Sequence, residues 1–123
     1  MKKFLSERLK SFLPAFEGLN YLIRNEGNAI IHLIATGIVL IICFILKLNL
    51  SEWMLIILAI TLVWFAELIN TAIEKLTDII QPEFHPKAKI IKDLTASAVL
   101  ITAIFSIIIG LLIFGPKIYQ LFN

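Results

Sequence analysis

A stripe of polar side chains lies near the end of a long apolar segment of this chain. Its members are Glu67, Asn70, Thr71, Glu74 and Asp78. On an α-helix this spacing confines them to an arc of about 100°, so they share one face while the opposite face is apolar. Carboxylates within a membrane are costly unless they are paired, hydrated or bound to metal. We therefore predict that this polar stripe is a functional site.

Acids from the other two apolar segments extend the polar stripe. Glu26 precedes the first segment, and Asp93 precedes the third. Magnesium prefers oxygen ligands, commonly one or two carboxylates together with substrate phosphates. Glu74 lies about 10 Å beyond Glu67 along the helix axis, which predicts Glu67 at the depth of lipid headgroups and Glu74 in water. The deeper carboxylate is suited to accept a proton from a lipid hydroxyl, and the shallower one to hold a nucleotide-bound metal.

The segment after the polar stripe carries candidate contacts to a nucleotide. Glu83 and His85 lie in a proline-bounded loop, and Lys92 lies at the start of the third apolar segment. Phosphoryl transfer depends mainly on positioning and on neutralisation of charge. Dispersed side chains can therefore suffice without a glycine-rich phosphate loop.

Structural interpretations of the same residues remain open at this stage. Glu67 can be a neutral carboxyl that bridges two helices, since polar contacts hold membrane helices together. His32 is best interpreted as a satisfied packing residue. The other members can be interhelical hydrogen-bonding groups, solvated helix ends or loop residues: Asn70, Thr71, Glu74, Asp78, His85, Lys92 and Asp93. The functional interpretation depends on the prediction that five acids from three segments lie at the same depth in the membrane.

The composition predicts an all-α integral membrane protein with a single domain over residues 1–123. The chain is 59% apolar, with a mean hydropathy of +0.94, which is too apolar for a soluble domain or a nucleic-acid-binding domain of this size. A helix needs about 20 residues to cross the hydrocarbon. We predict membrane helices at 29–46, 53–74 and 94–114. Cys43, the single cysteine, is expected to be an inert core thiol.

The remaining segments are predicted to connect and orient these helices. Residues 1–25 are basic and moderately apolar, which is typical of an amphipathic surface helix, and Pro14 is expected to bend or break it. Ser51 is a candidate N-cap for the second membrane helix, which we expect to continue to about Asp78. The third is expected to end near Gly115 and Pro116, leaving a short external tail.

The distribution of charge predicts the orientation in the membrane. Nine of the eleven Lys and Arg residues precede the first apolar run or lie between the second and third. The excess of positive charge predicts a cytoplasmic N-terminus and a cytoplasmic 75–93 loop. Eight of the nine acids lie on the same side, which indicates a site there for a cation and for phosphate.

Two blocks of the chain resemble the small bacterial diacylglycerol kinase and undecaprenol kinase family. The first block is Glu67-Leu-Ile-Asn70-Thr71-Ala-Ile-Glu74-Lys-Leu-Thr-Asp78, and the second is Glu83-Phe84-His85-Pro-Lys-Ala-Lys-Ile-Ile-Lys92-Asp93. Glu26 lies 41 residues before Glu67, as in the family pattern. The resemblance covers essentially the whole chain, and the two blocks together are highly specific.

The resemblance implies an enzyme of the bacterial cytoplasmic membrane that transfers the γ-phosphate of ATP, with Mg²⁺, to a lipid alcohol. It implies a homotrimer of three-span subunits whose active sites are shared between neighbours. By the same resemblance Glu67 is the general base, Glu26 and Glu74 are the Mg-ATP carboxylates, and Asn70 positions the site. The nucleotide contacts that it implies are Glu83, His85, Lys92 and Asp93.

The acceptor lipid and two rival functions stay open. The stretch from Asp78 to Pro86 is more similar to the undecaprenol-directed members, whereas Gly27 and Ile30 depart from their pattern. A cation channel subunit would distribute polar residues through the depth of the membrane, but here they gather at one end. A scaffold without catalytic activity would leave the charged cytoplasmic cluster without a purpose.

Overall fold

The computed structural model contains five helices and describes the backbone of residues 1–123, with the side chains of residue 1 and residues 6–123. The helices are α1 (Lys2–Lys10), α2 (Leu13–Asn25), α3 (Gly27–Ile45), α4 (Leu50–Ile80) and α5 (Pro86–Phe122). Helices α3, α4 and α5 are each long and apolar enough to cross a membrane. The predicted all-α fold with three membrane helices is therefore confirmed. The apolar and basic side chains expected at positions 2–5 of the surface helix lie outside the described side chains.

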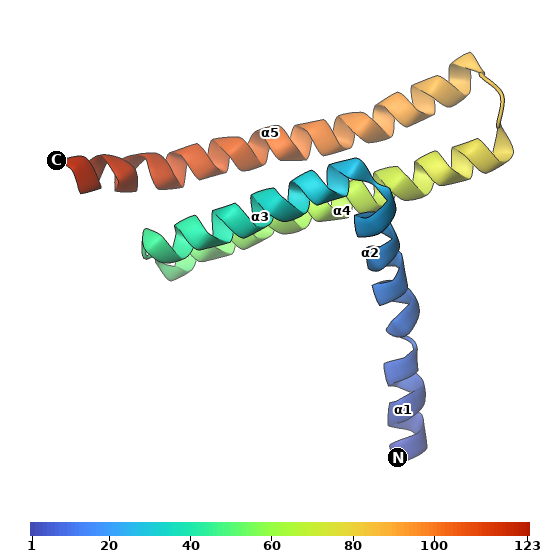
Figure 1. Ribbon diagram of the computed structural model, residues 1–123, viewed down its shortest axis with the longest axis horizontal. Coiled ribbons are helices and arrows are strands. Elements are labelled where there is room, and N and C mark those ends of the chain that lie inside the picture. The colour runs from blue at the N-terminus through green and yellow to red at the C-terminus, as the bar shows by residue number, and fades with distance from the viewer.

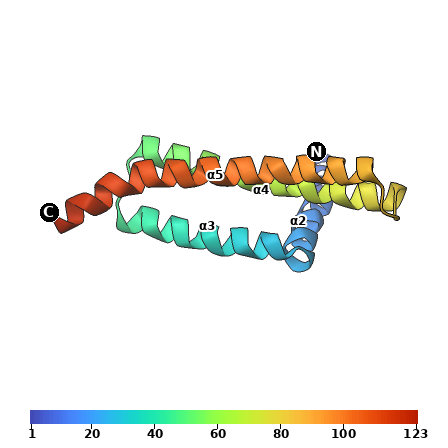
Figure 2. The same ribbon diagram turned by 90° about the horizontal axis from the view of Figure 1, so that it is seen from above.

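Helices α3, α4 and α5 run side by side, whereas α1 and α2 extend across their direction (Figures 1 and 2). The turn between α2 and α3 is made at Glu26, whose backbone is extended and whose N–H donates to the carbonyl of Leu22 at 3.0 Å. The Leu22 side chain is only 1% exposed. This buried anchor holds α2 against the membrane helices.

The N-terminal segment is divided into two helices, as the proline predicted, but the break precedes the proline. The α1 helix ends before Ser11, and α2 begins at Leu13, so that Pro14 occupies the first turn of α2. Proline is tolerated there because the first N–H groups of a helix have no intrahelical acceptor. Pro14 therefore starts a helix and does not interrupt one.

Each membrane helix is longer than its predicted span of 29–46, 53–74 or 94–114. The first ends one residue earlier than predicted. The 31 residues of α4 extend about 47 Å, well beyond the roughly 30 Å of hydrocarbon. The apolar runs predicted only the part in lipid, because polar residues that form helices well continue α4 into water.

The expected end of the third helix at Pro116 is wrong, because α5 continues through this proline to Phe122. A proline inside a helix removes one backbone hydrogen bond and kinks the helix without necessarily ending it. Figure 2 shows the C-terminal part of α5 turning away from the line of the rest. Lys117 Nζ lies 3.0 Å from Glu52 Oε2, and this ion pair ties the last turns of α5 to α4.

The N-terminus of α4 is capped by Asn49 and not by Ser51, which corrects the sequence prediction. The Asn49 side chain accepts from the Glu52 N–H at 3.0 Å, and the Glu52 carboxylate accepts from the Asn49 N–H at 2.8 Å. Lys47 has a φ of 48°, so a left-handed residue closes the turn. Cys43, Leu48 and Ile56 form a buried cluster beneath this turn, consistent with a core thiol.

Helices α4 and α5 form the most extensively packed pair. Ser106 Oγ donates to the Ala59 carbonyl at 3.3 Å in the middle of the pair. No residue of α5 is buried within a single chain, for the side chains that the structure describes. Large apolar side chains on α5 are therefore free to contact lipid or another protein.

We predict that Asn49→Ala destabilises the turn between α3 and α4, because it leaves N-terminal amides of α4 without an acceptor. The expected loss is about 1 kcal/mol of unfolding free energy. Unfolding in detergent micelles, followed by circular dichroism, measures it. Asn49→Asp keeps the acceptor oxygen and should retain the stability of the parent chain. Equal loss in both variants would contradict the capping role.

Candidate active site

Three polar contacts at successive levels join α3 to α4 in antiparallel register. They are Lys75 Nζ to Glu26 Oε1 at 2.9 Å, His32 Nε2 to Glu67 Oε2 at 3.7 Å, and Trp64 Nε1 to Thr36 Oγ1 at 3.1 Å. Residues later in α3 contact residues earlier in α4, as in a regular helical hairpin. Of the polar stripe, Glu67 is the member that faces a partner on α3 in these contacts.

Glu67 is the most deeply buried acid of the described chain. Its side chain is 2% exposed, and Oε2 has no hydrogen-bond partner among the described residues. The nearest group able to carry positive charge is His32, which itself is 19% exposed. A buried carboxylate oxygen without a hydrogen bond is expensive, which makes Glu67 a candidate functional group.

Asn70 lies one turn further along α4 and faces the opposite neighbour, α5. It is 7% exposed, its Oδ1 has no hydrogen-bond partner in the described chain, and it lines a pocket of about 230 Å³ with Thr95 and Thr102 of α5. Glu74 follows and is half-buried. The polar stripe thus lies between α3 on one side and α5 on the other.

A second pocket of about 340 Å³ is formed where α4, the 81–85 loop and α5 meet. Four of the predicted nucleotide contacts line it: Glu83, His85, Lys92 and Asp93. Lys92 Nζ bonds Asp78 Oδ1 at 2.6 Å, and Lys89 Nζ bonds Asp93 Oδ2 at 2.5 Å.

His85 has a structural role as well, because it is the N-cap of α5. Its Nδ1 accepts from the Lys87 N–H at 3.2 Å, and Pro86 occupies the next position. An accepting Nδ1 places the proton of the neutral imidazole on Nε2. His85 therefore presents an N–H donor at the loop pocket while it caps the helix.

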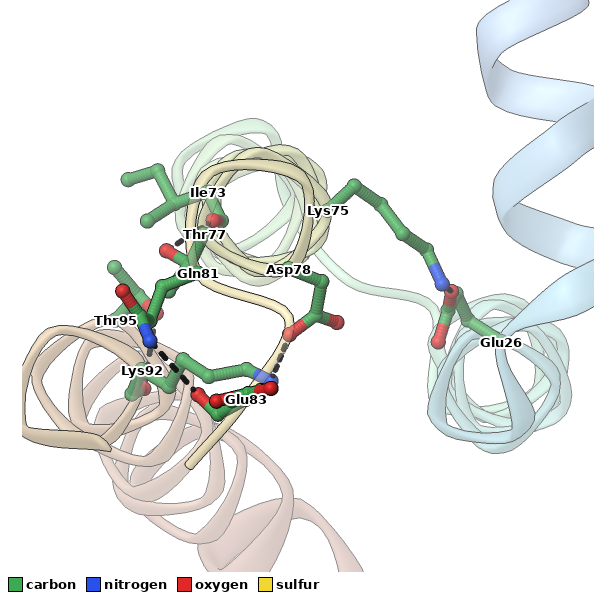
Figure 3. A network of polar contacts seen from close by, with 9 residues as sticks. All are labelled: Glu26, Ile73, Lys75, Thr77, Asp78, Gln81, Glu83, Lys92 and Thr95. Carbon is green, nitrogen blue, oxygen red and sulfur yellow. Dashed lines mark hydrogen bonds and ion pairs between the residues drawn. The ribbon is translucent and has the colours of Figure 1, made fainter. Parts of the chain in front are cut away.

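The predicted site residues divide into two groups on different sides of α4. Figure 3 shows Lys75 extending toward Glu26 on α3, whereas Asp78 extends toward Lys92 on α5. Glu67 lies on the α3 side, where it faces His32, and the loop pocket lies on the α5 side. A single chain consequently brings together some of the predicted site residues but not all of them.

The oxygen donors present fit a magnesium ion in their chemistry. Of the two predicted metal carboxylates, Glu26 has a buried Oε1 that is ion-paired with Lys75, and Glu74 is half-buried. No three His, Cys, Asp or Glu side chains of the described residues gather closely enough to enclose a metal. A magnesium ion held here by one or two carboxylates would need its remaining ligands from substrate phosphates or water.

Three residues that join α3 to α4 were not predicted from the sequence to do so. His32 was interpreted as a packing residue, and Lys75 and Thr36 were given no role. A usable signal was present, because an antiparallel hairpin pairs polar residues at matching distances from its turn. His32 and Glu67 are the deepest strongly polar residues of their two helices, which predicts such a pair.

The chain is similar in sequence to known proteins. The profile of the family described as Prokaryotic diacylglycerol kinase matches residues 14–114. An undecaprenol kinase of Bacillus subtilis (strain 168) is 45% identical over 114 residues, covering 93% of either chain. A diacylglycerol kinase of Synechocystis is 37% identical over 92% of this chain and 65% of its own length. A diacylglycerol kinase of Helicobacter pylori (strain J99) is 52% identical over 54 residues, which are 44% of this chain and 42% of that one.

The family profile spans most of the chain, including the surface arm from Pro14, the whole polar stripe and the loop pocket. A relative with 45% identity over nearly full length adds independent support. The chain belongs to the prokaryotic diacylglycerol kinase family and is an integral membrane lipid kinase.

Proposed function

We propose that this protein transfers the γ-phosphate of ATP, in a Mg²⁺-dependent reaction, to the hydroxyl of a membrane lipid, giving the lipid phosphate and ADP. The observation that carries the proposal is the Glu67 carboxylate, which is buried within α4, a helix apolar enough to cross a membrane, with one oxygen that has no hydrogen-bond partner in the described chain. Such a group is costly to maintain, and a proton-accepting role at the lipid hydroxyl accounts for that cost.

Glu67 acts as the general base in this mechanism. The lipid hydroxyl approaches Oε2, which accepts its proton as the oxygen attacks the γ-phosphorus and the bond to the ADP oxygen breaks. General-base assistance of this kind contributes about 10²-fold to 10⁴-fold to the rate. Asn70, buried one turn away, orients the reacting groups through its free Oδ1.

Glu26 and Glu74 would hold Mg²⁺ when the nucleotide is bound, and the ion would supply neutralisation of charge on the phosphates. Lys75 keeps the Glu26 carboxylate in place at 2.9 Å. The loop pocket supplies the nucleotide contacts: Glu83, His85, Lys92 and Asp93. Its volume of about 340 Å³ is within the range of small-molecule sites.

Undecaprenol is the proposed acceptor, with diacylglycerol as the alternative. The full-length similarity to an undecaprenol kinase supports the first, and the similarity to diacylglycerol kinases supports the second. Either lipid would enter sideways from the bilayer, so that only its hydroxyl has to reach Glu67.

We further propose a homotrimer in the bacterial cytoplasmic membrane, with the N-terminus and the 75–93 loop in the cytoplasm. Positive charge on these segments supports the orientation. The division of the site into an α3 side and a loop side supports sharing, because a neighbouring subunit can bring the two together.

Glu67→Gln should lower kcat about 100-fold or more, because the amide cannot accept the hydroxyl proton. The assay is transfer of labelled phosphate from Mg-ATP to undecaprenol or to diacylglycerol in micelles, with and without a chelator. Glu52→Gln, a matched change at the other end of α4, should retain activity. Full activity of Glu67→Gln would exclude this mechanism.

Lys92→Ala should raise the KM for ATP about tenfold or more, because it removes a charged contact to phosphate. Asp78→Asn removes only the exposed ion pair with Lys92, and such pairs contribute little. Its KM should change little. If the two variants have the same KM, Lys92 acts through the ion pair and not on the nucleotide.

Co-expression of Glu67→Gln and Lys92→Ala subunits tests sharing of the site. If the base and the loop come from different subunits, random mixing leaves about a quarter of the sites intact in a cyclic assembly. Activity at low ATP should then exceed that of either variant alone. A mixture no more active than the better variant would place both groups in one chain.

A further inference from the structure

We propose that His32 is a positioning residue for the reaction and holds the Glu67 carboxylate in its productive orientation. This rests on the proposed function, since it assumes that Glu67 is the base. The His32 Nε2 atom lies 3.7 Å from Glu67 Oε2, slightly longer than a hydrogen bond. Catalytic hydrogen bonds are often long without substrate and shorten in the reacting complex.

The His32 ring is fixed by contacts that do not involve Glu67. It packs edge-to-face on Trp64 of α4, with ring centroids 6.5 Å apart. The Trp64 indole N–H donates to Thr36 Oγ1 at 3.1 Å, and the Thr36 hydroxyl donates to the His32 carbonyl at 2.7 Å. The edge-to-face packing on Trp64 orients the imidazole, whose Nε2 faces the buried carboxylate.

The charged groups around Glu67 indicate what His32 does for this carboxylate. Glu26 and Glu74 act on Glu67 with like charge, whereas His32 acts with opposite charge when protonated and as an N–H donor when neutral. At 2% exposure, Glu67 has little access to water that would otherwise solvate its charge. His32 therefore compensates the carboxylate in the state that accepts the lipid proton.

His32→Phe and His32→Gln separate this role from packing. Phenylalanine keeps the ring against Trp64 but removes the N–H, whereas glutamine keeps an N–H donor of similar reach. We expect His32→Phe to lower kcat about tenfold or more while the KM for ATP changes less than about twofold. His32→Gln should recover most of kcat.

Thr36→Val is the control for a structural role. It removes the hydrogen bonds that Thr36 makes with Trp64 and with the His32 carbonyl, and so loosens α3 against α4, but its side chain of the same shape keeps the imidazole packed on Trp64. It should lower the thermal midpoint in micelles at least as much as His32→Phe and retain kcat. Loss of kcat in Thr36→Val equal to that in His32→Phe would overturn the proposal, as would failure of His32→Gln to recover activity.

The outcome also distinguishes this inference from the proposed function. If Glu67→Gln is inactive and His32→Phe has the parent kcat, only the role of His32 is overturned. If Glu67→Gln has the parent kcat, the assignment of the base fails and the role of His32 fails with it.

Discussion

The structure depends on a carboxylate placed where lipid would otherwise exclude it. Glu67 is 2% exposed on a helix that is apolar enough to cross a membrane. Burial of a charge in such surroundings is tolerated only with compensation. The antiparallel pairing of α3 with α4 provides it, because the hairpin turn sets the register at which His32 meets Glu67.

The same register explains why the turn and the N-terminal arm are built so specifically. A capping box at Asn49 and a left-handed Lys47 start α4 at a fixed rotation relative to α3. At the other end, Leu22 and the extended Glu26 fix where α3 begins. A shift of one residue at either end would rotate Glu67 by about 100° and away from His32.

Helix α4 is a shared wall between two chemically different sides. On the α3 side lie the buried Glu67 carboxylate and His32, and on the α5 side lie the ion pair of Lys92 with Asp78 and the loop pocket. A lipid hydroxyl and a nucleotide have opposite solvation requirements. Separation of the two sides matches that difference, and assembly of subunits is the means by which we propose they meet.

The sequence by itself determined the three membrane helices and the polar stripe, because helical periodicity and membrane thickness are local or one-dimensional constraints. It determined the family through two blocks of matching residues. It misplaced the N-cap at Ser51 and the end of the third helix at Pro116, where neighbouring contacts outweigh local preference. Only the tertiary structure decided which residues meet: His32 with Glu67, Glu26 with Lys75, and Asp78 with Lys92. Those pairs depend on interhelical register, which is set by turn geometry and packing between residues far apart in the chain.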